Sequence, residues 1–205
     1  MFWIYGIGFI AQGLFSARTF IQWILSEKAK RVITPTIYWQ LSLLASFLFF
    51  IYGWLRDDFS IILGQLISYY VYIWNLNTKG HWKKLHTILR VIFMITPPIA
   101  ITLFFIEDKS VISELFNEMS FSLLLFGSIA QVIFTLRFVY QWWYSREIDE
   151  SVLPLGFFVM SIIGSSMISI YGFIRLDPVL ILGQGVGVVV YARNIYLLVK
   201  SSKPK

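Results

Sequence analysis

The sequence predicts an all-α integral membrane protein with seven transmembrane helices. Of its 205 residues, 58% are hydrophobic and only 14% are charged, which is too little charge to cover a soluble domain of this size. Seven apolar stretches are each close to the ~20 residues that cross the hydrocarbon core of a bilayer. They cover approximately residues 3–25, 36–55, 59–76, 87–106, 120–144, 153–174 and 178–199.

Composition also excludes several kinds of site. The chain has no cysteine, so disulfides, thiolate catalysis and cysteine-based metal sites are excluded. The two histidines, His81 and His86, lie in a basic loop without the spacing of metal ligands, and we predict neither a metal nor a cofactor. Residues 1–15 lack the positive region and the small-residue cleavage site of a signal peptide, so we expect a retained first helix.

Lysine and arginine are distributed unevenly between the two ends of the predicted helices. The positive-inside rule assigns the richer side to the cytoplasm, with the N-terminus outside and the C-terminus inside. The net charge of +6 is therefore a property of the cytoplasmic face, and we expect no nucleic-acid partner. The richer side has Lys28, Lys30, Arg31, Lys79, Lys83, Lys84, Arg90, Arg146, Lys200, Lys203 and Lys205, and the other side has Arg56, Lys109 and Arg175.

The chain contains an internal repeat at a constant offset of 119 residues. Identical pairs include Arg18/Arg137 and Asn75/Asn194, and a duplication explains them. Two three-span repeats joined directly would have opposite orientations in the membrane. The single extra span between them gives the second repeat the same orientation as the first. We therefore predict two parallel repeats in a 3+1+3 order. The predicted domains are repeat 1 at 1–80, a linker helix with loops at 81–118, and repeat 2 at 119–205.

Polar side chains recur on one face of the first and third helices of each repeat, because at ~100° per residue each set falls within one arc. Lipid tails cannot form hydrogen bonds, so these faces should meet other helices or line a substrate-binding cavity. For the glutamines, a role as bridges between helices stays open, whereas the two asparagines favour a cavity lining. The residues are Gln12, Arg18, Gln22, Gln131, Arg137 and Gln141 on the first helices, and Gln65, Tyr72, Asn75, Gln184, Tyr191 and Asn194 on the third.

Arg18 and Arg137 lie deep within predicted spans. Each is about eight residues, or roughly 12 Å, from its cytoplasmic loop, and a charge at that depth costs several kcal/mol unless it is paired. No aspartate or glutamate lies deep within any predicted span. We therefore predict that both bind an anionic ligand, most simply a phosphate, which a guanidinium grips bidentately. Snorkelling to the interface, or pairing with Glu27 or Glu147, is the alternative.

Three further residues have less specific assignments. Arg193 lies nearer the cytoplasmic end of its span, with Trp74 at the matching position of the first repeat, and it either snorkels or joins the binding site. Pro35 and Pro154 open the second span of each repeat, either as a simple helix start or as a hinge used in gating. The remaining predictions are loop-fixing ion pairs at Arg56/Asp58 and Arg175/Asp177.

Two segments resemble a known family. GFIAQGLFSARTFIQWILSEKAK followed by Pro35, and DPVLILGQGVGVVVYARNIYLL, are similar to the lipid A biosynthesis N-terminal domain family, over about residues 6–78 and 125–198. That domain in turn resembles the three-helix bundles of the PQ-loop, SWEET and semiSWEET group, which implies a SWEET-like arrangement. By analogy, the resemblance implies that Asn75 and Asn194 face a central pocket. The family name comes from domains associated with lipid-A-disaccharide synthase.

These observations lead to a functional hypothesis. We predict a multi-pass carrier or flippase of the bacterial inner membrane for a phosphate-bearing glycolipid, such as a polyprenyl-phosphate sugar or a lipid A intermediate. The expected partners are this membrane lipid or lipid-linked sugar and a glycosyltransferase. The alternatives are a SWEET-like carrier of small sugars and a membrane module that anchors or regulates a lipid A glycosyltransferase. No nucleophile–base pair, metal set or nucleotide motif is recognisable, so we expect that the chain is not an enzyme and that no synthase activity transfers to it.

Overall fold

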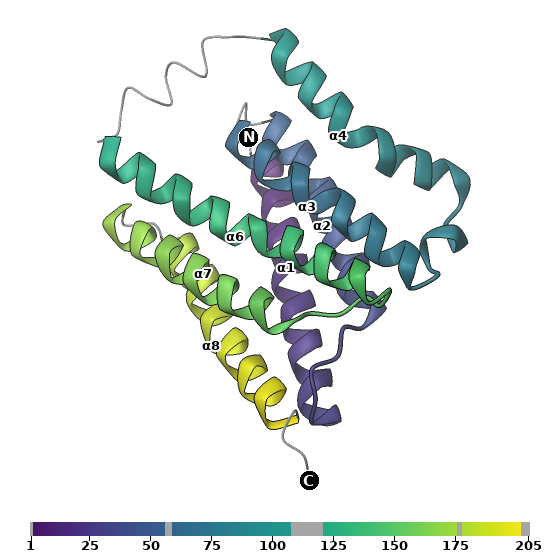
Figure 1. Ribbon diagram of the computed structural model, residues 1–205. Helices are drawn as coiled ribbons and strands as arrows, with labels where there is room; N and C mark the ends of the chain where they lie inside the picture. The colour runs from purple at the N-terminus through teal and green to yellow at the C-terminus, as the bar shows by residue number, and fades with distance from the viewer. Residues whose placement is uncertain (1, 56–58, 108–120, 176–177, 202–205) are drawn as a thin grey trace. The chain divides into compact units, whose positions relative to one another are not determined.

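The computed structural model describes residues 2–55, 59–107, 121–175 and 178–201. These residues form seven α-helices and one short 3-10 helix, with no strand among them, and the predicted all-α class is confirmed. The helices are α1 (Phe2–Ala29), α2 (Thr36–Leu55), α3 (Phe59–Thr78), η1 (Trp82–Lys84), α4 (Thr87–Glu107), α6 (Phe121–Glu147), α7 (Leu155–Arg175) and α8 (Pro178–Ser201) (Figure 1).

Two of the described helices have both the length and the apolar composition to cross a membrane. These are Thr36–Leu55 and Leu155–Ile174, each of 20 residues, which is enough for a hydrocarbon core about 30 Å thick. By contrast, α1, α6 and α8 each contain at least one arginine and two side-chain amides within their apolar sequence, which lowers their mean hydropathy. The other five predicted spans, and with them the complete seven-span arrangement, stay predictions.

The chain divides into two compact units. The first contains residues 1–18 and 36–119, and the second contains residues 19–35 and 120–205. The helix α1 therefore contributes its first part to one unit and its last part to the other. The domain boundaries predicted above follow the repeat in the sequence and stay a prediction.

Each unit has a buried core in which the same glycine–tyrosine contact occurs. A Cβ atom added to Gly8 would lie 3.0 Å from the ring of Tyr52, and one added to Gly127 would lie 2.8 Å from the ring of Tyr171. These pairs are 119 residues apart in the sequence, so the repetition extends to side-chain packing. The largest fully buried side chains include Trp39, Phe50, Tyr69 and Tyr72 in the first unit, and Phe157, Phe158 and Val190 in the second.

The helix α4 contains Pro97 and Pro98 in its interior. A proline has no backbone N–H, so Pro98 leaves the carbonyl of Met94, four residues earlier, without its usual helical donor. The hydroxyl of Tyr70 on α3 donates to this carbonyl at 3.3 Å, which replaces the missing hydrogen bond. This contact and the edge-to-face pair of Phe47 with Phe93, at 5.5 Å, attach α4 to the first unit.

Candidate functional site

In the first unit, Arg18 lies in an enclosure of aromatic rings. Its side chain is only 5% exposed, and its guanidinium carbon is 4.4 Å from the ring centroid of Phe15, 5.0 Å from that of Tyr38 and 5.4 Å from that of Tyr72. One guanidinium nitrogen donates to the hydroxyl of Ser42 at 2.5 Å. Ring faces attract a cation, most strongly where water is excluded, so these neighbours hold the charge inside the helix bundle.

The second unit repeats this arrangement around Arg137, which is 3% exposed. Its guanidinium carbon lies 3.3 Å from the ring centroid of Phe134, 5.5 Å from that of Phe157 and 5.8 Å from that of Tyr191. Each ring stands 119 residues after its counterpart around Arg18. We call each set of an arginine and its three matching rings an arginine box. The two boxes are Arg18 with Phe15, Tyr38 and Tyr72, and Arg137 with Phe134, Phe157 and Tyr191.

A second repeated cluster fixes the loop between the first and second helices of each repeat. In the second unit, the amide nitrogen of Gln141 donates to the hydroxyl of Ser145 at 2.8 Å and to the carbonyl of Val152 at 2.9 Å. The backbone N–H of Val152 in turn donates to Ser145 at 3.2 Å. Gln141 and Ser145 are completely buried. We call this arrangement the loop clasp, because it fastens the loop before α7 to the end of α6.

The other loop clasp lies within residues 19–35, which belong to the second unit. The amide nitrogen of Gln22 lies 2.9 Å from the hydroxyl of Ser26 and 3.3 Å from the carbonyl of Ile33. It also lies 2.9 Å from the amide oxygen of Asn194 on α8. The nitrogen has two protons, so it satisfies two of these three acceptors at a time. This clasp therefore also fastens the end of α1 to α8.

The two predicted cavity-lining asparagines are completely buried and use their amide groups inside their own helices. The amide nitrogen of Asn75 donates to the carbonyl of Val71, and that of Asn194 donates to the carbonyl of Val190, each at 2.9 Å. The amide oxygen of Asn194 accepts from Gln22. These contacts orient both asparagine side chains. The predicted position of the two asparagines at a central pocket stays a prediction.

The other predicted glutamines do not join these clusters. Gln12, Gln65 and Gln184 are half-buried, whereas Gln131 is exposed. Gln65 accepts a hydrogen bond from Ser46 at 2.7 Å, which is a bridge between α3 and α2 of the kind that amides form within bundles. A binding role for these four side chains stays a prediction.

Pro35 and Pro154 immediately precede α2 and α7, and Pro154 is buried whereas Pro35 is half-buried. A proline fits a helix start because it needs no partner for an N–H, and the hinge role is untested. The predicted ion pairs Arg56/Asp58 and Arg175/Asp177 involve residues 56–58 and 177, which lie outside the described residues. In the described part of the chain, no group of three or more histidine or acidic side chains is placed to hold a metal ion.

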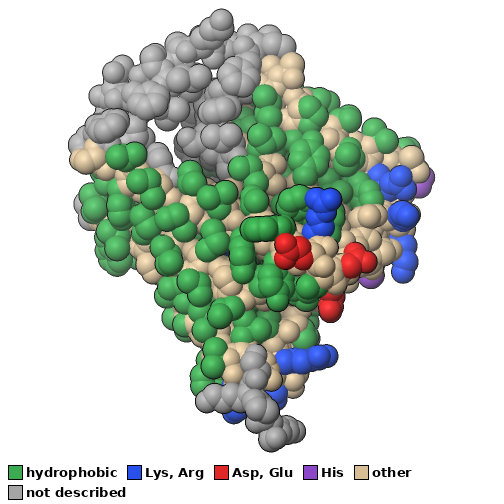
Figure 2. Space-filling view, in the orientation of Figure 1, with side chains coloured by type: hydrophobic (Ala, Val, Ile, Leu, Met, Phe, Trp, Pro, Cys, Tyr) green, Lys and Arg blue, Asp and Glu red, His purple; other side chains and the backbone are tan. Residues whose placement is uncertain are grey.

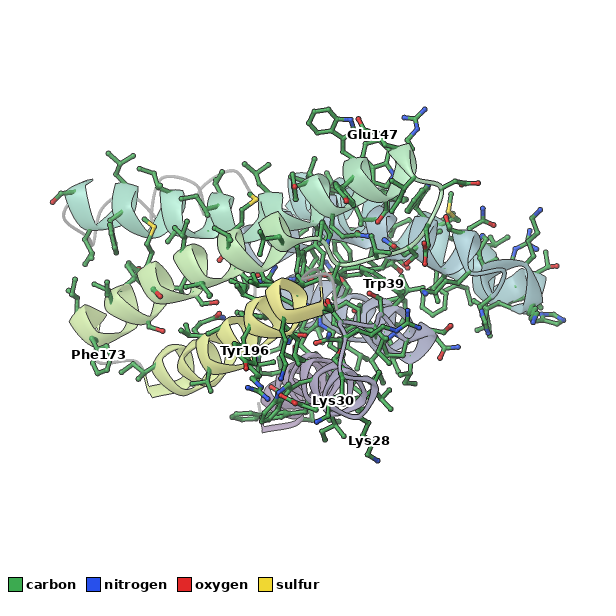
Figure 3. The ribbon with its side chains drawn as sticks, turned by 60° about the horizontal axis from the view of Figure 1, so that its bottom comes forward. Lys28, Lys30, Trp39, Glu147, Phe173 and Tyr196 are labelled. Carbon is green, nitrogen blue, oxygen red and sulfur yellow. The ribbon has the colours of Figure 1, made fainter. Side chains whose placement is uncertain are left out.

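Arg193 forms an ion pair with Glu27 at the end of α1. Its Nε donates to Oε1 of Glu27 and its Nη2 donates to Oε2 at 3.1 Å, while the indole of Trp23 donates to Oε1 at 3.2 Å. The guanidinium also lies 4.9 Å from the ring of Tyr196 on α8, which Figure 3 labels. Glu27 is thus paired with Arg193. Arg18 and Arg137 are both buried, and their binding of an anionic ligand stays a prediction.

This ion pair makes stability depend on pH. The hydrogen bond from Arg193 lowers the pKa of the Glu27 carboxyl below its ordinary value. The pair therefore contributes fully above the unfolded-state pKa and loses its contribution as the pH falls through the lower folded-state pKa. We expect Glu27→Gln to lower the Tm slightly at neutral pH, because the pair is exposed, and the difference from wild type to disappear on acidification.

The matched control is Glu147→Gln, which removes an exposed carboxylate at the end of α6 (Figure 3). Thermal unfolding of the three proteins across a pH series measures the effect. A difference between wild type and Glu27→Gln that stays constant with pH would contradict the assignment.

Sequence reasoning missed the hydroxyls and rings that complete these clusters. Tyr38 belongs to the first arginine box, Ser42 accepts a hydrogen bond from its arginine, and Ser26 and Ser145 belong to the loop clasps. The serines were detectable, because Ser26/Ser145 and Ser42/Ser161 also stand 119 residues apart. Tyr38 corresponds to Phe157, so comparing identical residues alone could not find that pair.

Several curated relatives match nearly the whole chain. The lipid-A-disaccharide synthase of Chlamydia pneumoniae is 27% identical over 98% of this chain and 34% of its own length. That of Chlamydia caviae is 29% identical over the same shares, and that of Chlamydia muridarum is 28% identical over 90% of this chain and 32% of its own length. The chain thus spans about a third of the length of these bacterial relatives. No solved structure matches it significantly.

These relatives correct one prediction. We expected from the residues that the chain is not an enzyme, and that expectation is wrong by this comparison, because the relatives are named as a synthase, which is an enzyme. This sequence contains no recognisable nucleophile–base pair, whereas each synthase is about three times as long as this chain.

The profile of the lipid A biosynthesis N-terminal domain matches the chain twice, at residues 7–77 and 126–196. The two matches begin 119 residues apart, at the offset of the internal repeat, and together they cover more than half of the 205 residues. The chain belongs to the lipid A biosynthesis N-terminal domain family and contains two copies of that domain.

Proposed function

We propose that the chain is a membrane-embedded module of lipid-A-disaccharide synthesis, which holds a phosphate-bearing glycolipid substrate for glycosyl transfer. The observation behind this proposal is the match of 98% of the chain to a third of a lipid-A-disaccharide synthase. A module that accompanies such a synthase would anchor or regulate the glycosyltransferase at the surface where its lipid substrate lies.

The surface of the described residues favours a location within the bilayer. Large apolar side chains are exposed on most helices, for example Phe9 at 68%, Ile88 at 63%, Phe173 at 62% and Val189 at 65%. Hydrophobic side chains cover most of the described surface seen in Figure 2. Soluble proteins rarely expose apolar patches of this extent. We therefore propose a multi-pass protein of the bacterial inner membrane.

The arginine boxes are the proposed phosphate sites. A guanidinium stays protonated at physiological pH and its planar donors match the oxygens of a phosphate. Each box keeps that charge less than a tenth exposed, between ring faces, where an ionic hydrogen bond is stronger than in water. The amides of Asn75, Asn194, Gln65 and Gln184 are proposed to meet the sugar hydroxyls.

A chimeric synthase tests this function. The chain replaces the matching third of the Chlamydia pneumoniae relative, and formation of lipid-A disaccharide from labelled monosaccharide precursors is measured in isolated membranes. We expect the chimera to be active and the relative without that third to lose most of its activity. In the chimera, Arg18→Gln/Arg137→Gln should lower the rate at least tenfold, because loss of a charge-assisted phosphate contact costs about 1.5–3 kcal/mol.

The control for the charge is Arg146→Gln, which removes an exposed arginine from the last turn of α6 and should leave the rate unchanged. Equal activity of the relative with and without its matching third would refute the module. If the chimera needs the chain for activity and the double arginine variant is as active as the unmutated chimera, the phosphate sites are refuted and the module is not.

A second candidate is the carrier or flippase, which the duplication of a complete arginine box favours. Carriers built from two parallel repeats bind substrate near the repeat interface and alternate its access. The purified chain in liposomes would then speed the movement of a fluorescent phosphate-bearing glycolipid between leaflets. A rate equal to that of empty liposomes would exclude this candidate, and uptake of free sugar instead would favour the small-sugar carrier.

A further inference from the structure

The segment between α3 and α4 is a rigid turn rather than a loose charged loop. At the end of α3, Gly80 has a φ of 69°, which a glycine adopts without strain. The N–H of His81 donates to the carbonyl of Leu76 at 2.9 Å, and the N–H of Gly80 donates to that of Asn77 at 2.8 Å. This pair of bonds is the Schellman motif, which ends a helix at a defined residue.

The rest of the segment is equally ordered. The ring nitrogen Nδ1 of His81 bonds the carbonyl of Lys79 at 2.8 Å, and η1 follows with a hydrogen bond from Leu85 to Trp82 at 3.2 Å. The N–H of Ile88 then donates to Nδ1 of His86 at 3.3 Å, which caps the start of α4. We call residues 79–90 the basic turn.

Positive charge is concentrated on this turn. Lys83 and Lys84 are exposed, and neither they nor Arg90 forms an ion pair with any described residue. The sequence has no acidic residue between Asp58 and Glu107. The Nε atom of Arg90 is buried and has no hydrogen-bond acceptor in the described structure. A buried donor without a partner is destabilising.

Exposed aliphatic side chains adjoin these charges. Ile88 is 63% exposed, Leu89 is 45% exposed and Val91 is 51% exposed, all within the first two turns of α4, while Trp82 is half-buried within η1. A surface that binds an acidic protein would not need bare aliphatic groups beside its lysines. Basic side chains beside apolar ones and a tryptophan fit the boundary between lipid headgroups and acyl chains.

We propose that the basic turn binds the phosphate headgroups of anionic membrane phospholipids, with Lys83 and Lys84 at the headgroups and the start of α4 among the acyl chains. The inference rests on the membrane location proposed above and is independent of glycosyl transfer. Each basic side chain near an anionic surface adds about 1 kcal/mol of attraction, so two lysines change the affinity by about ten- to thirtyfold.

The test uses the purified full chain in neutral detergent micelles, titrated with fluorescent phosphatidylglycerol or phosphatidylcholine. We expect wild type to prefer phosphatidylglycerol, and Lys83→Gln/Lys84→Gln to weaken its binding by about tenfold or more. High salt should remove the preference, because ions screen exposed charges. The matched control is Lys28→Gln/Lys30→Gln, which removes two exposed lysines, one in the last turn of α1 and one immediately after it (Figure 3), and should change the affinity less than twofold.

Several outcomes would overturn this inference. Equal losses in the two double variants would mean that total charge, rather than the basic turn, decides binding. An unchanged phosphatidylglycerol affinity in Lys83→Gln/Lys84→Gln would show that the basic turn does not bind the headgroups. Release of the chain from cell membranes by alkaline carbonate would remove the membrane location itself. If the chimera is inactive while the chain still prefers phosphatidylglycerol, the glycosyl-transfer role is refuted and the lipid-binding role of the basic turn is retained.

Discussion

Replacing Gln22 with leucine is expected to lower the free energy of unfolding by about 2–4 kcal/mol. Leucine has a similar size but cannot donate, so the amide oxygen of Asn194 loses its donor and the carbonyl of Ile33 keeps only a long contact, at 3.4 Å, with Ser26. Gln22 is 2% exposed and Asn194 is completely buried, so water cannot replace the lost donor. A buried acceptor without a partner costs about 1–3 kcal/mol.

Unfolding of detergent-solubilised protein, followed by tryptophan fluorescence, measures this loss. The control is Gln131→Leu, which removes an exposed amide from α6 and should stay within about 0.5 kcal/mol of wild type. Combining Gln22→Leu with Asn194→Leu should restore part of the loss, because the double variant no longer buries an Asn194 amide oxygen without a donor. If the two single glutamine variants are equally stable, the loop clasp does not stabilise the second unit.

Replacing Gly164 with alanine is expected to cost about 1–3 kcal/mol through overpacking. The added Cβ would lie 2.8 Å from Cβ, 2.9 Å from Cα and 3.0 Å from the backbone nitrogen of Phe134 on α6. These are not the far ends of a flexible side chain, so α6 and α7 must move apart. Phe134 is also a wall of the second arginine box, so the shift should loosen the packing around Arg137.

Gly185→Ala is the matched control, because Gly185 lies within a helix of the same unit and nothing lies within 4 Å of its added Cβ. Alanine favours a helix over glycine by about 0.5–1 kcal/mol, so this variant should be as stable as wild type or slightly more so. Thermal unfolding of both variants under one condition gives the comparison. A Gly164→Ala protein with the Tm of Gly185→Ala would show that α6 and α7 are further apart than described.

The all-helical class and the two domain copies could be predicted because both depend on patterns along the chain. Apolar stretches of about 20 residues indicate membrane-spanning helices, and the offset of 119 residues is visible without coordinates. Helix ends were less predictable. The first span was expected to end at residue 25, yet α1 continues to Ala29, where the Ser26 loop clasp and the Glu27 ion pair hold its last turn.

The surroundings of the site residues could not be predicted from the sequence alone. Helical spacing places Gln131 and Arg137 on one face, yet Gln131 is exposed and Arg137 is buried, because burial depends on which neighbouring helix covers each turn. Charge counting suggested a carboxylate as the alternative partner of Arg18. The structure instead surrounds it with rings from α1, α2 and α3, and aromatic side chains are too common in this sequence to be singled out.

The sharing of α1 between the two units has a consequence for dissecting the gene. A fragment that encodes only the second copy would lack Gln22 and Glu27, and so would leave Asn194 and Arg193 without the partners they have in the intact chain. The copies arose by duplication, but neither half is now expected to be autonomous. A functional split protein would have to be made by co-expressing both pieces, so that the first supplies the missing turns of helix to the second.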